Sequence, residues 1–133
     1  MMAAAKKRLI AVVDDDELVR TALQRLLKSS GFAVSSFGSA EDLLKSGELL
    51  EIDCLIADIR MPGMSGLDLQ AKLKAENSAI PIVFITAHGD EKMRLQAMRG
   101  GAVGFLAKPF DSGILLDRVR AALEAVSGGD AQI

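Results

Sequence analysis

Five short apolar runs recur along the 133-residue chain, and each is too short to form a helix of ordinary length. The runs are rich in Val, Ile and Phe, which are residues that favour β-strands. They are Leu9–Val13, Ala33–Phe37, Cys54–Ala57, Ile82–Ile85 and Val103–Leu106. The sequence therefore predicts five strands at these positions.

Stretches in which apolar residues recur at helical spacing separate and follow the predicted strands. Ser39 with Asp42 three residues later resembles a capping box, which indicates where the second helix begins. The fifth helix is expected to start at its cap, Asp111, and to end at Ser127-Gly128-Gly129. The apolar helical positions lie within 19–27, 43–44, 67–73, 93–98 and 115–126.

Alternation of strands and helices is typical of a parallel sheet with helices on both faces. Right-handed crossovers restrict the possible topologies, and one common solution has the strand order 2-1-3-4-5. We therefore predict an α/β, flavodoxin-like fold: a doubly wound five-stranded parallel sheet with five flanking helices. One domain is expected over residues 8–126, followed by a flexible tail or linker stump at 127–133.

Polar side chains follow four of the five predicted strands. Asp14-Asp15-Asp16-Glu17 follows the first strand, Asp58 the third, Thr86-Ala87 the fourth and Lys108-Pro109 the fifth. The second strand, which lies at the sheet edge in this order, ends in Phe37-Gly38 and offers no such group. Because ligands bind beyond the carboxyl ends of such strands, these four clusters are expected to form one site.

The spacing of strands predicts the chemistry of this site. Neighbouring strands lie about 4.8 Å apart, so Asp14 or Asp15 is expected roughly 5 Å from Asp58. Two carboxylates at that distance repel by about 3 kcal/mol at an effective dielectric near 20, so a cation is expected between them. A small set of oxygen ligands suits Mg²⁺. Lys108 can reach across two strands, and the whole arrangement favours a phosphoryl group on Asp58 as the nucleophile.

Composition and charge narrow the function classes. A single Cys excludes an internal disulfide and a Cys-rich metal centre, and a single His makes Ser-His-Asp catalysis improbable. The net charge of −2 gives no general attraction to nucleic acid or to an anionic membrane. The chain has no phosphate-binding glycine motif, so nucleotide binding is not supported. The apolar run after Lys6-Lys7-Arg8 is too short for a signal peptide or membrane span, and we expect a cytoplasmic protein.

Four segments, taken together, resemble the receiver domain of two-component response regulators over about residues 8–126. The stretches from Thr86 to Asp90 and from Gly101 to Phe105 resemble the subfamily whose full-length members carry a helix-turn-helix DNA-binding domain. Residues 8–126 themselves contain no such output domain. The four segments are Val12–Asp16, Asp58–Gly66, Thr86–His88 and Lys108–Phe110.

The resemblance implies a function for each position of the site. Asp58 would accept a phosphoryl group from a histidine kinase or a phosphotransfer protein. Mg²⁺ would be bound directly by Asp15 and Asp58, through water by Asp14, and by the backbone carbonyl of Arg60. Thr86, Ala87 and Lys108 would bind the phosphoryl group, and the Lys108-Pro109 bond would be cis.

The resemblance also implies a switch. Thr86 would move onto the phosphoryl oxygen and Phe105 would turn inward behind it. The face made by the fourth helix, fifth strand and fifth helix would then change its binding preference, and it is a possible homodimer interface. Arg60 and His88 would tune how long the phosphoryl group survives. Such a domain is a signalling protein that assists its own phosphorylation and dephosphorylation, and it binds no membrane or nucleic acid directly.

Two other functions fit parts of the pattern. A haloacid-dehalogenase-type phosphohydrolase would use Asp14 as its nucleophile, but Leu18 stands where that family has a Thr or Val. A flavodoxin-type FMN protein would need a phosphate loop after the first strand, where this chain has four acids.

Overall fold

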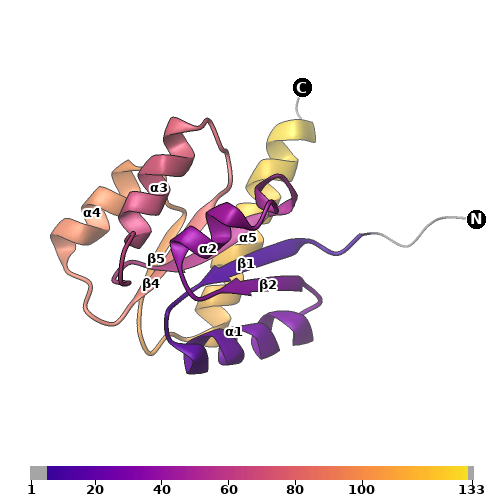
Figure 1. Cartoon of the computed structure of the whole chain (residues 1–133). Helices are drawn as coiled ribbons and strands as arrows, with labels where there is room; N and C mark the ends of the chain where they lie inside the picture. The colour runs from indigo at the N-terminus through magenta and orange to yellow at the C-terminus, as the bar shows by residue number, and fades with distance from the viewer. Residues whose placement is uncertain (1–5, 132–133) are drawn as a thin grey trace, which may run out of the picture.

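The computed structural model describes the backbone of residues 6–131 and the side chains of residues 6–125. Strands and helices alternate along the chain as the sequence predicts (Figure 1). The strands are β1 (Leu9–Val13), β2 (Ala33–Phe37), β3 (Cys54–Asp58), β4 (Ile82–Thr86) and β5 (Gly104–Ala107). The helices are α1 (Glu17–Ser29), α2 (Ala40–Lys45), the short 3₁₀ helix η1 (Leu49–Glu51), α3 (Gly66–Ala75), α4 (Glu91–Arg99) and α5 (Ser112–Ala131).

The five strands form one parallel sheet in the order β2-β1-β3-β4-β5, which confirms the predicted fold class. The register aligns the carboxyl ends of the strands along one edge. Val13 pairs with Ala57, Asp58 with Ile85, and Thr86 with Ala107. The residues that directly follow β1, β3, β4 and β5 therefore emerge side by side.

Two hydrophobic layers cover the sheet, one on each face. Ala11 and Val13 of β1 pack in the layer beneath α2, α3 and α4, whereas Ile10 and Val12 pack beneath α1 and α5. This alternation follows from the two-residue period of a strand, and Figure 1 shows the two groups of helices on opposite faces. Because both faces are covered, the central strands are apolar throughout and leave only their ends for polar chemistry.

The helices begin at the side-chain caps that the sequence indicates. Ser39 accepts a hydrogen bond from the Asp42 N–H, and Asp111 accepts one from the Ile114 N–H. A complete capping box, which the sequence analysis did not identify, opens α3 between Ser65 and Asp68. The caps matter here because α1, α3, α4 and α5 all start at the same sheet edge as the polar clusters.

Two local predictions need correction, and one short helix was not predicted. β5 begins at Gly104, one residue later than predicted, and η1 was not predicted. The prediction that α5 ends at Ser127-Gly128-Gly129 is wrong, because the helix continues to Ala131. Each glycine costs about 1 kcal/mol in a helix interior, which does not force a helix to end. The predicted tail at 127–133 lies partly outside the described residues.

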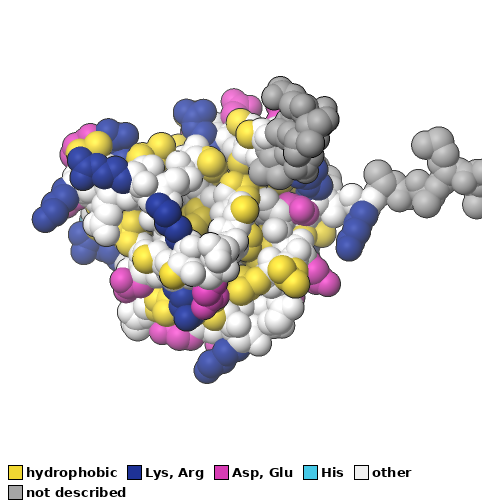
Figure 2. Space-filling model, turned by 90° about the horizontal axis from the view of Figure 1, so that it is seen from above, with side chains coloured by type: hydrophobic (Ala, Val, Ile, Leu, Met, Phe, Trp, Pro, Cys, Tyr) yellow, Lys and Arg dark blue, Asp and Glu magenta, His cyan; other side chains and the backbone are white. Residues whose placement is uncertain are grey.

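The surface over α2, α3 and α4 carries both signs of charge. Figure 2 shows Lys, Arg, Asp and Glu side chains interspersed, with hydrophobic side chains visible in small groups between them. None of the described helices is both long and apolar enough to cross a membrane.

Candidate functional site

Three acidic side chains meet at the carboxyl edge of the sheet. Asp14 follows β1, Asp15 comes next, and Asp58 is the last residue of β3. One carboxylate oxygen from each lies within 4.8 Å of the others. The predicted separation of roughly 5 Å is therefore found, and it arises because β1 and β3 are neighbours in the sheet.

Lys108 joins this acidic cluster from β5. Its Nζ donates one hydrogen bond to Asp14 Oδ2 and another to Asp58 Oδ2, each 2.8 Å long. The Asp14 side chain is fully buried and that of Asp58 is 8% exposed, so both ion pairs lie away from bulk water. The Lys108-Pro109 peptide bond that follows is cis, as the resemblance implied.

Burial and charge act in opposite directions on these groups. Burial raises the pKa of Asp14, and the nearby charge of Asp58 adds to this, while hydrogen bonds from Lys108 and from the Asp16 N–H act against it. Burial favours the neutral amine of Lys108, but its hydrogen bonds to Asp14 and Asp58 outweigh that effect and raise the pKa of Lys108. For Asp14, the effect of burial thus outweighs the hydrogen bonds and the positive charge of Lys108.

The backbone around β1 is fixed by contacts that sequence reasoning missed. Asp14 Oδ1 accepts a 2.9 Å hydrogen bond from the Asp16 N–H. Arg20, in α1, donates from Nη1 to the Asp14 backbone carbonyl at 2.6 Å. The only signal in the sequence is a basic residue in the helix that directly follows the acids. Arg20 therefore holds the turn that presents Asp14 and Asp15.

The loop after Asp58 is held from two sides. The Arg60 N–H donates to Asp58 Oδ1 at 3.2 Å. A side chain at Gly66 would collide with the Asp58 carbonyl oxygen, so only glycine allows α3 to start this close to the site. From the other side, Glu41 of α2 accepts a 3.0 Å hydrogen bond from the Met64 N–H. This bond lowers the pKa of Glu41.

Thr86 brings an unused hydroxyl to the edge of the same site. The residue is 1% exposed, and among the described residues its Oγ1 is the buried side-chain atom without a hydrogen-bond partner. Its backbone carbonyl accepts from the Lys108 N–H, which ties the end of β4 to Lys108. A buried hydroxyl without a partner is costly, so the Thr86 hydroxyl has an unused hydrogen-bonding capacity at this end of the sheet.

The remaining predicted site residues lie at the rim. Arg60, Ala87 and His88 are exposed. Phe105 of β5 is partly buried and packs against the hydrophobic layer beneath α2, α3 and α4. The structure thus brings Asp14, Asp15, Asp58 and Lys108 together and places Thr86 at the end of the strand between Asp58 and Lys108. The roles predicted for these residues, and for Arg60 and His88, stay predictions.

The donor set fits Mg²⁺. Asp14, Asp15 and Asp58 offer closely spaced carboxylate oxygens, which are the ligands that this ion prefers. Among them Asp15 is exposed, whereas Asp14 and Asp58 are buried and accept hydrogen bonds from Lys108. A divalent cation here would complete the charge compensation that Lys108 alone leaves unfinished.

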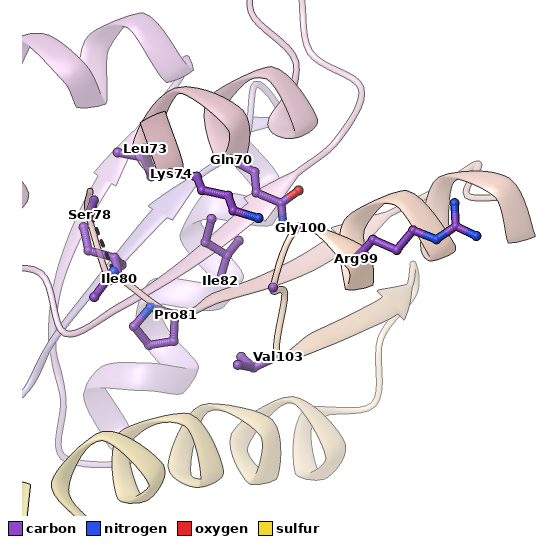
Figure 3. A pocket seen from close by; sticks show the side chains of 12 residues that line it. Gln70, Leu73, Lys74, Ser78, Ile80, Pro81, Ile82, Arg99, Gly100 and Val103 are labelled. Atoms are coloured by element: carbon purple, nitrogen blue, oxygen red, sulfur yellow. Dashed lines mark hydrogen bonds between the residues drawn. The ribbon is translucent and has the colours of Figure 1, made fainter. Parts of the chain in front are cut away.

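A groove at the opposite edge of the sheet is separate from this site. It has a volume of about 360 Å³ and lies where α3 and α4 end and β4 begins (Figure 3). One of its polar lining residues is the buried Gln70, whose Nε2 donates to the Ala97 carbonyl at 2.9 Å. Ile82 at the groove and Thr86 at the site are the two ends of β4, about 13 Å apart.

Comparison with known families shows which proteins this chain resembles. The family model described as the response regulator receiver domain matches residues 10–120. Nodulation protein W of Bradyrhizobium diazoefficiens is 49% identical over 121 residues, which cover 91% of this chain and 53% of that protein. The transcriptional regulatory protein FixJ of Azorhizobium caulinodans is 43% identical, with coverage of 86% and 54%. The chain therefore spans about half the length of these curated relatives.

Solved structures give the same result. The response regulator StyR is 45% identical with a TM-score of 0.86, and the alignment covers 96% of this chain and 65% of that one. The structure of FixJ-N is 37% identical with a TM-score of 0.80, covering 90% and 96%. These similarities do not support the alternative of a haloacid-dehalogenase-type hydrolase.

Proposed function

The chain belongs to the response regulator receiver family of two-component systems, and from this premise we propose that it is a switch controlled by phosphorylation of Asp58. The observation that carries the proposal is the 2.8 Å contact of Lys108 with Asp58 in a pocket that also holds Asp14, Asp15 and the unpartnered Thr86 hydroxyl. That arrangement provides a nucleophile, a fixed cation and a hydrogen-bond donor for one phosphoryl group.

In the proposed reaction a carboxylate oxygen of Asp58 attacks the phosphorus of a phosphohistidine on a histidine kinase or phosphotransfer protein. The O–P bond forms as the P–N bond breaks, and the imidazole leaves with the electron pair and takes a proton from solvent. Lys108 transfers its hydrogen bond from the carboxylate to a phosphoryl oxygen. When bound, Mg²⁺ supplies positive charge that offsets the charge of the phosphoryl oxygens.

We assign the ligands and the phosphoryl contacts as the family resemblance implies. Asp15, Asp58 and the Arg60 carbonyl would hold the ion directly, with Asp14 acting through water. The Thr86 hydroxyl and the Ala87 backbone would join Lys108 on the phosphoryl group. Two features support the Thr86 assignment: its hydroxyl is buried without a partner, and its strand lies between those of Asp58 and Lys108.

Thr86 and Phe105 form the proposed output path. Movement of the Thr86 hydroxyl onto the phosphoryl group would allow Phe105 to turn inward and would change the face made by α4, β5 and α5. Only a difference in phosphoryl affinity between two conformers can shift their populations. This face is also the proposed surface for a homodimer, and Arg60 and His88 at the rim would set the phosphoryl lifetime.

We also propose domain boundaries, a fused output and a localisation for this protein. Residues 8–126 would act as the receiver unit and 127–133 as the start of a linker, and a relative named as a transcriptional regulatory protein suggests a fused regulatory output. We propose a cytoplasmic signalling protein that assists its own phosphorylation and dephosphorylation and that does not itself bind DNA or membranes.

The test is to incubate the protein with acetyl phosphate, with and without Mg²⁺, and to locate the modification by mass spectrometry. We expect one phosphoryl group on Asp58 that depends on Mg²⁺. Asp58→Ala should abolish it, while Asp42→Ala, the matched change of an exposed acid in α2, should not. Modification that persists in Asp58→Ala, or that occurs on Asp14, would contradict the proposal.

A further inference from the structure

We propose that Gly89 is a positioning residue for Thr86 and Phe105. Because it has no side chain, the loop between β4 and α4 rests directly on both residues and holds them in the arrangement described here. This inference rests on the proposed function, since it concerns the connection between the phosphoryl site at Asp58 and Phe105.

The contact is closer than any side chain allows. A β-carbon at Gly89 would lie 2.6 Å from Thr86 Cγ2, 2.8 Å from Phe105 Cζ and 2.9 Å from Phe105 Cε1. Non-bonded carbon atoms are normally about 3.5–4.0 Å apart. Gly89 is not among the glycines with positive φ, so its backbone conformation is open to any residue. The need for glycine here is therefore set by Thr86 and Phe105 and not by the backbone.

The Thr86 contact bears directly on the phosphoryl site. The methyl group Cγ2 and the hydroxyl Oγ1 are attached to the same carbon, so rotation about χ1 moves both together. The loop touches the methyl group, while the hydroxyl is buried and unpartnered. Whatever fixes the methyl group thus fixes the direction of the hydroxyl. Gly89 in this way sets the starting position of the group that would turn toward the phosphoryl oxygen.

The Phe105 contact extends the same restraint to β5. The outer end of the ring, Cζ and Cε1, meets the loop, while the rest of the residue packs into the layer beneath α2, α3 and α4. One glycine therefore touches both members of the proposed switch pair. A methyl group at position 89 crowds the present arrangement and penalises it relative to one in which Thr86 and Phe105 have moved. The population then shifts toward the moved arrangement.

The variant Gly89→Ala tests this inference. In the absence of any phosphoryl donor, we expect the NMR signals of the Thr86 methyl group and the Phe105 ring to shift toward those of phosphorylated wild-type protein. At a fixed, limiting acetyl phosphate concentration, we expect roughly fivefold more Asp58 phosphate at steady state, the factor that corresponds to the low end of overpacking effects. Unchanged signals and unchanged phosphorylation would show that the loop between β4 and α4 moves away to make room for the added methyl group, and would overturn the inference.

Gly100→Ala is the matched control, because it creates similar crowding at the other end of α4. A β-carbon there would lie 2.6 Å from Gln70 Cδ, and Figure 3 shows these two residues beside each other at the groove. We expect this variant to leave the Thr86 signals and the phosphorylation level unchanged. An equal response in Gly100→Ala would mean that any crowding of α4 has this effect, and it would overturn the role of Gly89.

Two further measurements test the inference, and the second needs no Gly89 variant. Phe105→Leu lacks both ring atoms that meet the loop, so adding Gly89→Ala to it should have a clearly smaller effect than in wild type; an equal effect contradicts the inference. In wild-type protein, proton contacts between the Gly89 α-carbon and the Phe105 ring should weaken on phosphorylation, and contacts that persist contradict it. Wild-type protein that is not phosphorylated on Asp58 refutes the proposed function, whereas phosphorylated wild type with an inert Gly89→Ala refutes only this inference.

Discussion

Lys108 Nζ lies 2.8 Å from Asp58 Oδ2, although 50 residues separate the two in the sequence. The lysine follows β5 and the aspartate ends β3, with β4 between them. Only a side chain as long as that of lysine crosses this gap from the strand end. Because the amine already touches the carboxylate, phosphorylation of Asp58 would need only a short transfer of the hydrogen bond from carboxylate to phosphoryl oxygen.

The first prediction concerns Lys108→Ala. Asp58 remains available as a nucleophile in this variant, so it should still accept a phosphoryl group from acetyl phosphate. The phosphoryl group should no longer affect the face made by α4, β5 and α5, because the Lys108 ammonium group that would contact it from the end of β5 is missing. We expect normal phosphate incorporation by mass spectrometry, but loss of the phosphorylation-dependent change in the Phe105 ring signals.

The control for this prediction is Lys28→Ala, which removes an exposed lysine near the end of α1. It should be phosphorylated and should show the wild-type change in the Phe105 signals. A Lys108→Ala protein that responds to phosphorylation like the control would count against the role of Lys108 in the switch.

The second prediction is that Mg²⁺ stabilises the folded protein. The three carboxylates are brought together only on folding, so the ion binds the folded state more tightly than the unfolded chain. The melting temperature should rise with Mg²⁺ concentration. At a hundredfold excess of Mg²⁺ over the dissociation constant, the free energy of unfolding should increase by about 2.7 kcal/mol. Chelation with EDTA should reverse the increase. A melting temperature that changes with neither Mg²⁺ nor EDTA would argue against a metal site.

The third prediction concerns Asp14→Asn. Burial raises the pKa of Asp14 above its ordinary value of 3.8, so the ionised side chain costs stability once the pH exceeds that value. At pH 7 without metal, the neutral asparagine should raise the melting temperature, because it avoids the cost of burying a charge. The gain should shrink as the pH falls toward 3.8.

Asp117→Asn, the same change at an exposed position of α5, is the control and should leave the melting temperature nearly unchanged. The stabilisation by Mg²⁺ should also weaken in Asp14→Asn, because one of the three carboxylates is lost. A lower melting temperature for Asp14→Asn at pH 7 would mean that its ion pair with Lys108 outweighs the cost of burial.

The sequence predicts the part of the site that the sheet positions. Strand composition identifies β1, β3, β4 and β5, and parallel order then brings Asp14, Asp58, Thr86 and Lys108 to one edge without any knowledge of loops. The separation of Asp14 from Asp58 follows from strand spacing alone. This works because the spacing between hydrogen-bonded strands hardly varies from one protein to another.

The contacts made by loops and helix ends could not be predicted in the same way. The bond from Met64 to Glu41 depends on the path of the loop after β3, and 23 residues separate its partners. Gln70 is a polar residue in an amphipathic helix, and nothing local shows that it is buried against the Ala97 carbonyl. The crowding of Gly89 by Phe105 arises from two elements that meet only in the folded protein. Each depends on tertiary packing that leaves no periodic signal.

The fourth prediction concerns Cys54. It lies fully buried in β3, and burial raises the pKa of its thiol from 9.0 to about 12. The reactive thiolate is therefore about a thousandfold scarcer at pH 8 than for an ordinary thiol. We expect almost no alkylation by iodoacetamide in the native protein and rapid alkylation in denaturant, which serves as the internal control. Rapid alkylation under native conditions would show that β3 opens readily.

The last prediction is a pH dependence set by Glu41. The Met64 N–H lowers the pKa of Glu41 from its ordinary value of 4.5, so the ionised carboxylate stabilises the folded state. This contribution is fully present above pH 4.5 and is lost as the pH falls through the lower folded-state pKa. Glu41→Ala should therefore lower the melting temperature slightly at pH 7. Glu41→Gln should lower it less, because its amide oxygen still accepts from Met64 but without the strength of a charged acceptor.

Below the lowered pKa of Glu41, the wild-type protein and Glu41→Gln should converge, since both then carry a neutral side chain at this position. Glu124→Ala, which removes an exposed glutamate on α5, is the matched control and should show no such convergence. Because Glu41 holds the loop that begins at Asp58, its loss should also slow phosphorylation by acetyl phosphate at pH 7. A pH-independent difference between wild type and Glu41→Gln would mean that the side chain acts through its shape and not through its charge.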